Sequence, residues 1–268
     1  MRRGASWTHT VEAVAIETPV AFEYNGIAQA VMLASPLDLH DFALGFSLSE
    51  GIIDSPAQLL EFDACDGADG ITLRLRVAGA AFDRLKRQRR ALAGRTGCGL
   101  CGVEQLSQVV RVLPPLPAPA AGSGGIAPAA IERALLEMRA RQTLHDATGA
   151  VHAAAWSASD GRVELVREDV GRHNALDKLI GALARSSFDA AGGFIVVSSR
   201  ASVEMVQKTV IGGVPLLAAV SAATTLAVDV ARDCGLTLVG FARGQHAVAY
   251  THPARLARAE TALCQSIN

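Results

Sequence analysis

Two cysteines separated by two residues are the most chemically pointed feature of the sequence. Cys98 and Cys101 lie in the segment 97–102, where glycines beside each thiol allow another molecule to approach closely. Six lysine and arginine residues lie between positions 84 and 95, opposed locally by Asp83 alone. Positive potential lowers the pKa of a nearby thiol, because it stabilises the thiolate. We therefore interpret this segment as a site for a nucleophilic, sulfur-accepting thiolate.

Three kinds of site fit a cysteine pair at this spacing. A structural zinc site needs four ligands, and the sequence has no second close pair of cysteines or of cysteine with histidine. A thioredoxin-like redox pair stands at a strand-to-helix junction, whereas this segment precedes a linker. We favour a persulfide or thiol relay over these two, expect no resident metal, and interpret Cys65, Cys234 and Cys264 as isolated packed residues. Zinc-deaminase chemistry is also disfavoured, because His152 is followed by two alanines rather than by the H-x-E pattern.

Polar segments follow several predicted strands in the second half of the chain. In an open α/β sheet, ligands bind beyond the carboxyl ends of the strands, where loops lead into helix N-termini. Arginine forks, hydroxyl groups and free helix amides there all suit a phosphate group. The polar segments are 168–174, 198–202, 221–225 and 243–246. We therefore expect a phosphate-bearing ligand at this edge of the sheet.

Two pairs with four-residue spacing lie on the helices that follow these segments. His173 and Asp177 would share a helix face, so the carboxylate could orient the imidazole. The alternative is that Asp169 caps this helix and Asp177 makes an ordinary polar contact. Glu204 and Lys208 repeat the spacing one helix later, and we interpret them as a surface ion pair.

Composition and patterning indicate an α/β protein with two folded units. The chain has 268 residues, of which 50% are hydrophobic and 19% charged, so it holds ample apolar material for packed cores. We expect a small α+β domain over 1–113, which carries the cysteines, a Pro/Gly/Ala linker over 114–127, and a three-layer α/β domain over 128–268. The apolar strands of the larger domain predict a largely parallel sheet with right-handed crossovers. Its expected elements are a helix opened by Pro128, strands over 162–167, 194–199, 214–220 and 236–242, helices over 172–184, 202–211 and 224–234, and an antiparallel closing strand over 247–251.

The smaller domain shows clear turn and helix signals. The Asn-Gly pair at 25–26 tolerates positive φ and predicts a hairpin within residues 11–33. Ser35 as a cap, Pro36 as the first helical residue and Asp38 near the free amides predict the start of a helix. The remaining signals are a helix end at Gly51 and an alternating strand over 71–77.

Charge and composition argue against several partners and locations. The formal charge is -1 and only 4% of residues are aromatic, so we expect no nucleic-acid partner. Few, scattered cysteines and the lack of an apolar run behind Arg2 and Arg3 favour a reducing, cytoplasmic setting without an export signal. The uncharged stretch 209–228 has the length of a membrane span, but Gly212, Gly213 and Pro215 divide it. We therefore expect a buried strand and helix there, and no membrane partner.

With these residues in view, the sequence resembles the formate dehydrogenase accessory sulfurtransferase family over nearly the whole chain. The block Arg-Glu-Asp-Val-Gly-Arg-His-Asn-Ala-Leu-Asp-Lys over 167–178 is far more specific than the cysteine pair alone. The other matching segments are 25–26, 41–46, 50–53, 98–102, 204–208, 238–241 and 250–252.

The resemblance implies a sulfur carrier and names its partners. A cysteine desulfurase would load a persulfide, and the sulfur would pass to the molybdenum of a bis(molybdopterin guanine dinucleotide) cofactor before insertion into formate dehydrogenase. GDP would mimic the cofactor, and a homodimer and a larger domain similar to the cytidine deaminase fold are expected. By resemblance, Cys98 carries the persulfide and Cys101 is its companion. The expected cofactor-binding residues, from the resemblance and the strand-end loops together, are Phe241, Ala242, Arg243, Gly244, Gln245, His246, Arg172, His173, Ser199, Arg200, Ser221 and Thr224.

Two loops of this site depart from the family pattern. Ser199-Arg200-Ala201 stands where Ser-Gly-Arg is common, and the segment 221–224 reads Ser-Ala-Ala-Thr instead of Ser-Ala-Pro-Thr. We expect these changes to affect nucleotide contacts more than sulfur chemistry. The alternatives to a sulfur carrier are a chaperone that only holds the cofactor, and a structural zinc protein.

Overall fold

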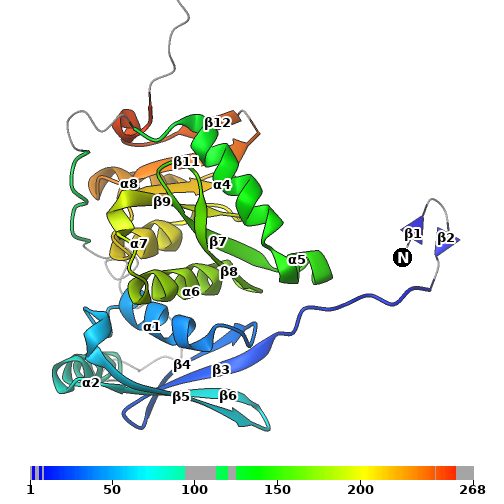
Figure 1. Ribbon diagram of the computed structural model, residues 1–268. Helices are drawn as coiled ribbons and strands as arrows, with labels where there is room; N and C mark the ends of the chain where they lie inside the picture. The colour runs from blue at the N-terminus through cyan, green and yellow to red at the C-terminus, as the bar shows by residue number, and fades with distance from the viewer. Residues whose placement is uncertain are drawn as a thin grey trace, which may run out of the picture.

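The computed structural model describes residues 2–3, 6–7, 9–93, 113–119, 125–244 and 246–257. Figure 1 shows two sheets, one above the other, with helices between them and on the outer face of the second sheet. A short antiparallel pair, β1 (Arg2–Arg3) and β2 (Ser6–Trp7), precedes both. The mixed α/β class expected from the sequence is confirmed.

The first sheet has four strands in the order β4-β3-β6-β5. Asn25 (φ 47°) and Gly26 (φ 81°) form the turn of the β3–β4 hairpin, as predicted. Alternate residues of β3 and β6 are buried, including Phe22 and Leu73, and they pack against Phe42 of the helix α1. The elements of this unit are β3 (Thr18–Tyr24), β4 (Ile27–Ala34), α1 (Leu39–Ser49), η1 (Pro56–Gln58), β5 (Leu59–Gly67), β6 (Gly70–Val77) and α2 (Gly79–Ala93).

The start of α1 differs from the prediction. The helix begins at Leu39, and its N-cap Asp38 has a left-handed backbone (φ 54°) without a capping side-chain hydrogen bond. Ser35 does not cap it: the Ser35 hydroxyl accepts a hydrogen bond from the Val170 amide at 3.2 Å, and its own amide donates to Asp169. The polar groups that suggested a cap are therefore used in a contact with the second half of the chain.

The second sheet has six strands in the order β12-β11-β10-β9-β7-β8. Strands β9, β10 and β11 are parallel, whereas β7 runs antiparallel to both β8 and β9, and β12 runs antiparallel to β11 as predicted. The sheet is therefore mixed rather than largely parallel, because strand β7 had no predicted counterpart. Its elements are α4 (Pro128–Ala140), α5 (Thr143–Thr148), β7 (His152–Ala158), β8 (Val163–Asp169), α6 (Arg172–Arg185), η2 (Ala190–Gly192), β9 (Gly193–Val197), α7 (Val203–Ile211), β10 (Leu216–Ala219), α8 (Thr225–Asp233), β11 (Thr237–Arg243), β12 (His246–Ala249) and η3 (Pro253–Arg255).

Helices cover both faces of this sheet, which gives the expected three layers. Ile195 and Val197 of β9 pack with residues of α6, α7 and α8 on one face, whereas Phe194 and Val196 pack with α4 on the other. The uncharged stretch 209–228 contains the end of α7, the strand β10 and the start of α8. Among the described residues, no helix has the length and apolar character needed to cross a membrane.

Helix α1 of the first unit lies directly against α6 of the second (Figure 1). The two helices meet at glycines: a Cβ atom on Gly45 would lie 1.7 Å from the Asp177 carbonyl oxygen, and one on Gly181 would lie 1.9 Å from the Asp41 carbonyl oxygen. Asp41 also bridges Arg167 and Arg185 at 2.6 Å each. This contact defines how the two sheets sit relative to each other, while the division into domains with a linker over 114–127 stays a prediction.

Candidate functional site

The loops that follow β9 and β10 are hydrogen-bonded to each other and to the end of β11. The Ser221 amide donates to the Ser199 carbonyl at 3.4 Å, and the Phe241 amide donates to the Ser221 carbonyl at 3.1 Å. Thr224 caps α8 through a bond from the Ala227 amide, and Ala201 pairs with Ala223 in an isolated bridge. Two of the predicted polar segments, 198–202 and 221–225, are therefore joined at the carboxyl edge of the parallel strands, and the end of β11 lies against the second of them.

The N-terminus of α6 adds two nitrogen groups to this edge. Its N-cap is Gly171, which leaves the first turn without a capping side chain. The Arg172 Nε and the His173 Nε2 are buried atoms without a hydrogen-bond partner among the described residues. Buried polar atoms are rarely left unpaired unless a ligand or water completes them, and both groups favour an anion at a helix N-terminus. This end of α6 is therefore suited to bind a phosphate group.

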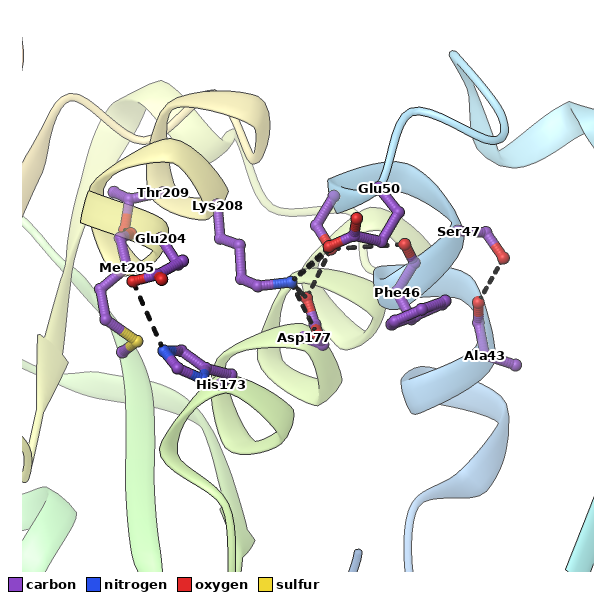
Figure 2. A network of polar contacts seen from close by, with 11 residues as sticks. Ala43, Phe46, Ser47, Glu50, His173, Asp177, Glu204, Met205, Lys208 and Thr209 are labelled. Atoms are coloured by element: carbon purple, nitrogen blue, oxygen red, sulfur yellow. Dashed lines mark hydrogen bonds and ion pairs between the residues drawn. The ribbon is translucent and has the colours of Figure 1, made fainter. Parts of the chain in front are cut away.

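Glu204, not Asp177, lies beside the His173 imidazole. His173 Nε2 is 3.8 Å from the Glu204 carboxylate. Figure 2 shows the two side chains facing each other. Burial lowers the pKa of His173, and the charge of Arg172 acts in the same direction. Burial acts to raise the pKa of Glu204, but the nearby polar groups of Ser202 and of its own backbone, together with the charges of His173 and Arg172, hold it below its usual range. The site thus combines a neutral imidazole with an ionised carboxylate, and the predicted His173–Asp177 pair is wrong.

Asp177 instead pairs with a lysine of the next helix. Lys208 Nζ lies 2.8 and 2.9 Å from the two Asp177 carboxylate oxygens, and 2.9 Å from the Ser49 hydroxyl. Lys208 and Asp177 are both buried, so the predicted Glu204–Lys208 surface pair is also wrong. The residues of each predicted pair do lie four positions apart on one helix, but their side chains contact residues of other helices instead of each other.

Asp169 does not cap α6, as one prediction had it, because the N-cap is Gly171 and no side chain caps it. Asp169 accepts hydrogen bonds from the Gly171 amide at 2.8 Å and from the Asn174 side chain at 3.0 Å. Its second oxygen lies 2.7 Å from Lys178 Nζ, and both side chains are fully buried. Asp169 therefore holds the turn that leads into α6, two residues before the N-cap Gly171.

His152 joins the site although the sequence analysis gave it no role. The Ser198 hydroxyl accepts a bond from the Ala153 amide and lies 3.5 Å from His152 Nδ1. Burial lowers the pKa of His152, and Arg172 and His145 lower it further. The residues after His152 are mainly alanine, so the sequence did not predict the strand β7. The position of the His152 imidazole at the edge of the sheet could therefore not be predicted either.

The β11–β12 turn carries the remaining predicted residues. Phe241 is 46% exposed with a left-handed backbone (φ 51°), and the Arg243 guanidinium donates back to the Val220 carbonyl at 2.9 Å. Ala242, Gly244 and His246 line a cavity of about 440 Å³ beside the first turns of α4. The predicted cofactor residues therefore fall into two groups: the strand-edge site, formed by the loops after β9 and β10 and the start of α6, and this cavity beside α4. Arg200 is exposed at the strand-edge site. Gln245 lies outside the described residues.

The cysteines of the predicted relay, Cys98 and Cys101, lie outside the described residues, as does Cys264. Cys234 is buried, as predicted, whereas Cys65 is only half-buried and donates to Asp63 at 3.2 Å. Within the described part of the chain, no group of three or more His, Cys, Asp or Glu residues could hold a metal ion.

A sequence profile described as the FdhD/NarQ family matches residues 15–257, which is most of the chain. The chain belongs to the FdhD/NarQ family. Proteins named "Sulfur carrier protein FdhD" are similar to it: that of Variovorax paradoxus (strain S110) is 61% identical over 91% of this chain and 86% of its own length. Those of Bordetella petrii and Xanthomonas campestris pv. campestris (strain B100) are 54% and 51% identical, over 91% and 95% of this chain and 87% and 89% of their own lengths.

A solved structure of another protein supports the architecture. The protein, from Desulfotalea psychrophila, is described as a formate dehydrogenase accessory protein, and it superposes with a TM-score of 0.71. It is 24% identical, and the match covers 91% of each chain. The likeness confirms the expected fold class, while the expected family is confirmed by the profile match and the relatives described above.

Proposed function

We propose that this FdhD/NarQ protein is a sulfur carrier that serves formate dehydrogenase. It takes sulfur from a cysteine desulfurase as a persulfide on Cys98 and delivers it, with Cys101 as companion, to the molybdenum of a bis(molybdopterin guanine dinucleotide) cofactor. The cofactor is the substrate of this transfer, and it is inserted into the dehydrogenase afterwards. We also propose that the protein acts in the cytoplasm as a homodimer.

The observation that carries this proposal is the pair of unpartnered nitrogen groups at the start of α6. Arg172 Nε and His173 Nε2 lie beside strand-end loops that are hydrogen-bonded together, and these groups suit the phosphates of a guanine dinucleotide. The relatives named sulfur carriers share more than half of their residues with this chain over most of its length. Together they support a protein that handles both sulfur and a phosphate-bearing cofactor.

Persulfide formation is the direct test of the sulfur step. The purified protein is incubated with a cysteine desulfurase and cysteine, and its mass is measured before and after treatment with a reductant. We expect the mass of at least one sulfur atom to be gained and then lost on reduction, with the gain missing in the double variant Cys98→Ala/Cys101→Ala. Cys65→Ala is the matched control: the carboxylate of Asp63 raises the pKa of the Cys65 thiol, so that thiol is a poor nucleophile and its loss should not reduce the gain.

The outcome also separates the sulfur carrier from its alternatives. A cofactor-holding chaperone predicts that the Cys98→Ala/Cys101→Ala variant still supports an active formate dehydrogenase in cells that lack the wild-type protein. A zinc protein predicts stoichiometric zinc in the purified chain, lost in the same variant. Either result, or wild-type protein without a mass gain, would overturn the proposal.

Nucleotide binding tests the strand-edge site separately. We expect GDP, used as a probe of the guanine dinucleotide, to bind the full chain in calorimetry, and Arg172→Ala to weaken it about tenfold or more, because a charged hydrogen bond contributes roughly 1.5–3 kcal/mol. Arg76→Ala is the control, since Arg76 forms an exposed ion pair with Glu61 on the first sheet. Equal affinity in the wild type and Arg172→Ala would remove the strand edge as the binding site.

A further inference from the structure

A buried polar network joins three helices beneath the strand-edge site (Figure 2). Lys208 of α7 reaches Asp177 of α6 with both carboxylate oxygens within 2.9 Å, the Ser49 hydroxyl at 2.9 Å and the Glu50 carboxylate at 3.3 Å. The side chains of Lys208 and Asp177 are 9% and 1% exposed. Ser49 ends α1 and also donates to Asp177 at 2.6 Å. One ammonium group thus holds oxygens from α1, its C-cap and α6 together.

The same two helices make a second polar contact one turn closer to the ligand edge. His173 precedes Asp177 by four residues on α6, and Glu204 precedes Lys208 by four residues on α7. Residues four apart lie on one helix face, so the His173–Glu204 contact lies directly above the Asp177–Lys208 contact. Any rotation or shift of α7 that breaks the lower contact must also move Glu204 relative to His173.

A stabilising role alone does not account for the lower contact. Desolvation of a buried ion pair offsets most of its attraction, and apolar replacements of such pairs are often as stable. What a buried pair does provide is a fixed geometry, because only one arrangement satisfies both charges. Burial raises the pKa of the Asp177 carboxyl, while the ammonium of Lys208 and the hydroxyl of Ser49 act against that rise.

We propose that Lys208 is a positioning residue for the strand-edge site: through Asp177 it holds α7 so that Glu204 faces His173, and through Ser49 and Glu50 it links this arrangement to α1. The inference rests on the proposed function, in which this edge receives the phosphates of the cofactor. Its consequence is that ligand binding at the edge and the seating of the first unit on α6 are coupled.

The test is a double-mutant cycle on GDP affinity in the full-length protein. The double variant Asp177→Asn/Lys208→Met removes both charges, so that no unpaired charge is left buried and the chain still folds. We expect it to weaken GDP binding about tenfold when Glu204 is present and less than twofold in a Glu204→Gln background, because coupled residues act non-additively. The exposed Asp229–Arg232 pair of α8 supplies the control: Asp229→Asn/Arg232→Gln should leave affinity unchanged.

A purely structural pair predicts something different. It would lower the unfolding temperature, yet its effect on GDP affinity, measured well below that temperature, would be absent or equal in both backgrounds. Either of those outcomes would overturn the proposal. The milder Glu50→Gln gives a further check on the link to α1, with an expected weakening of about threefold that also disappears in the Glu204→Gln background.

A readout without ligand separates this inference from the proposed function. The groups that face His173 are Arg172, Glu204, Lys208 and His152, and of these the Glu204 carboxylate raises the pKa of His173. The Lys208 charge lowers the pKa of His173, so its loss in Asp177→Asn/Lys208→Met raises that pKa directly, and equally so in a Glu204→Gln background where no carboxylate can be displaced. If Glu204 is also displaced, the titration midpoint of the His173 imidazole, measured by NMR, should shift to a lower value in the protein with Glu204 than the shift in the Glu204→Gln background predicts. Equal shifts in the two backgrounds would refute the positioning role even if GDP binds, whereas unequal shifts in a protein that fails to bind GDP would refute the proposed ligand site alone.

Discussion

The glycine contact between α1 and α6 leads to a sharp prediction for Gly45→Ala. The added Cβ would lie 1.7 Å from the Asp177 carbonyl oxygen and 2.8 Å from the Gly181 amide nitrogen, whereas real Cβ contacts essentially never fall below 3.0 Å. The two helices must therefore separate by about 1.3 Å, and neither neighbour is a flexible side chain that can rotate away. Overpacking of this kind costs about 1–3 kcal/mol, and because backbone meets backbone here we expect about 3 kcal/mol.

Urea unfolding of the full chain, followed by circular dichroism, measures this cost. Gly45→Ala should lower the urea midpoint, and Gly181→Ala should do the same, because its Cβ would lie 1.9 Å from the Asp41 carbonyl oxygen. Gly79→Ala is the matched control: nothing lies within 4 Å of its added Cβ, so the change should stay within about 0.5 kcal/mol. If Gly45→Ala unfolds at the same urea concentration as Gly79→Ala, α1 and α6 do not meet in the way described.

Three further predictions follow from buried charged groups. Arg255 donates to the Gly235 carbonyl and to a carbonyl of the segment 113–119. Arg255→Met should therefore destabilise the folded chain by about 1–3 kcal/mol and increase the rate of proteolysis within that segment. An unchanged rate of proteolysis would contradict the contact. Burial lowers the pKa of His152 and His173 below the ordinary 6.5, so the unfolded chain binds more protons than the folded chain as the pH falls, and stability should decline below about pH 6.5. In unfolding temperatures measured against pH, the variant His152→Gln/His173→Gln should show a smaller decline than the wild type. Equal declines in the two proteins would refute this prediction. Asp41→Asn should cost about 1.5–3 kcal/mol in urea unfolding, since it weakens charged hydrogen bonds to two arginines, and a wild-type midpoint would count against the bridge.

Most elements of the second sheet could be predicted because their strands are rich in branched apolar residues and their helices begin after polar loops. Phe194 to Val197 is the clearest case, and all four residues are fully buried in β9. Strand β7 was missed because its sequence is mainly alanine, which has a low strand propensity. Strands β8 and β9 pair with β7 on both sides, and helices on both faces of the sheet bury Ala153, Ala154 and Ala155, so tertiary context rather than local preference determines the strand.

The site was predicted less completely than the fold. The sequence predicted that Arg172, His173 and Ser199 lie at the same edge of the sheet, because each follows the carboxyl end of a predicted strand. The pairings failed because four-residue spacing shows which residues share a helix face, but not which neighbouring helix that face meets. Asp177 and Lys208 lie on different helices and form an ion pair. No local sequence pattern could predict this pair, because it depends on how the two helices pack.

The chain on either side of the cysteines is attached to different halves of the molecule. Before them, α2 packs in the core of the first sheet through Ala81 and Leu85; after them, the Leu116 amide bonds to the Cys234 carbonyl of the second unit at 2.8 Å. Cys98 follows the last residue of α2 by five positions, so no more than roughly 18 Å of backbone joins it to that anchor. In the proposed transfer, sulfur on Cys98 would therefore start within that distance of the end of α2, so a ligand that receives it must come within reach of this helix.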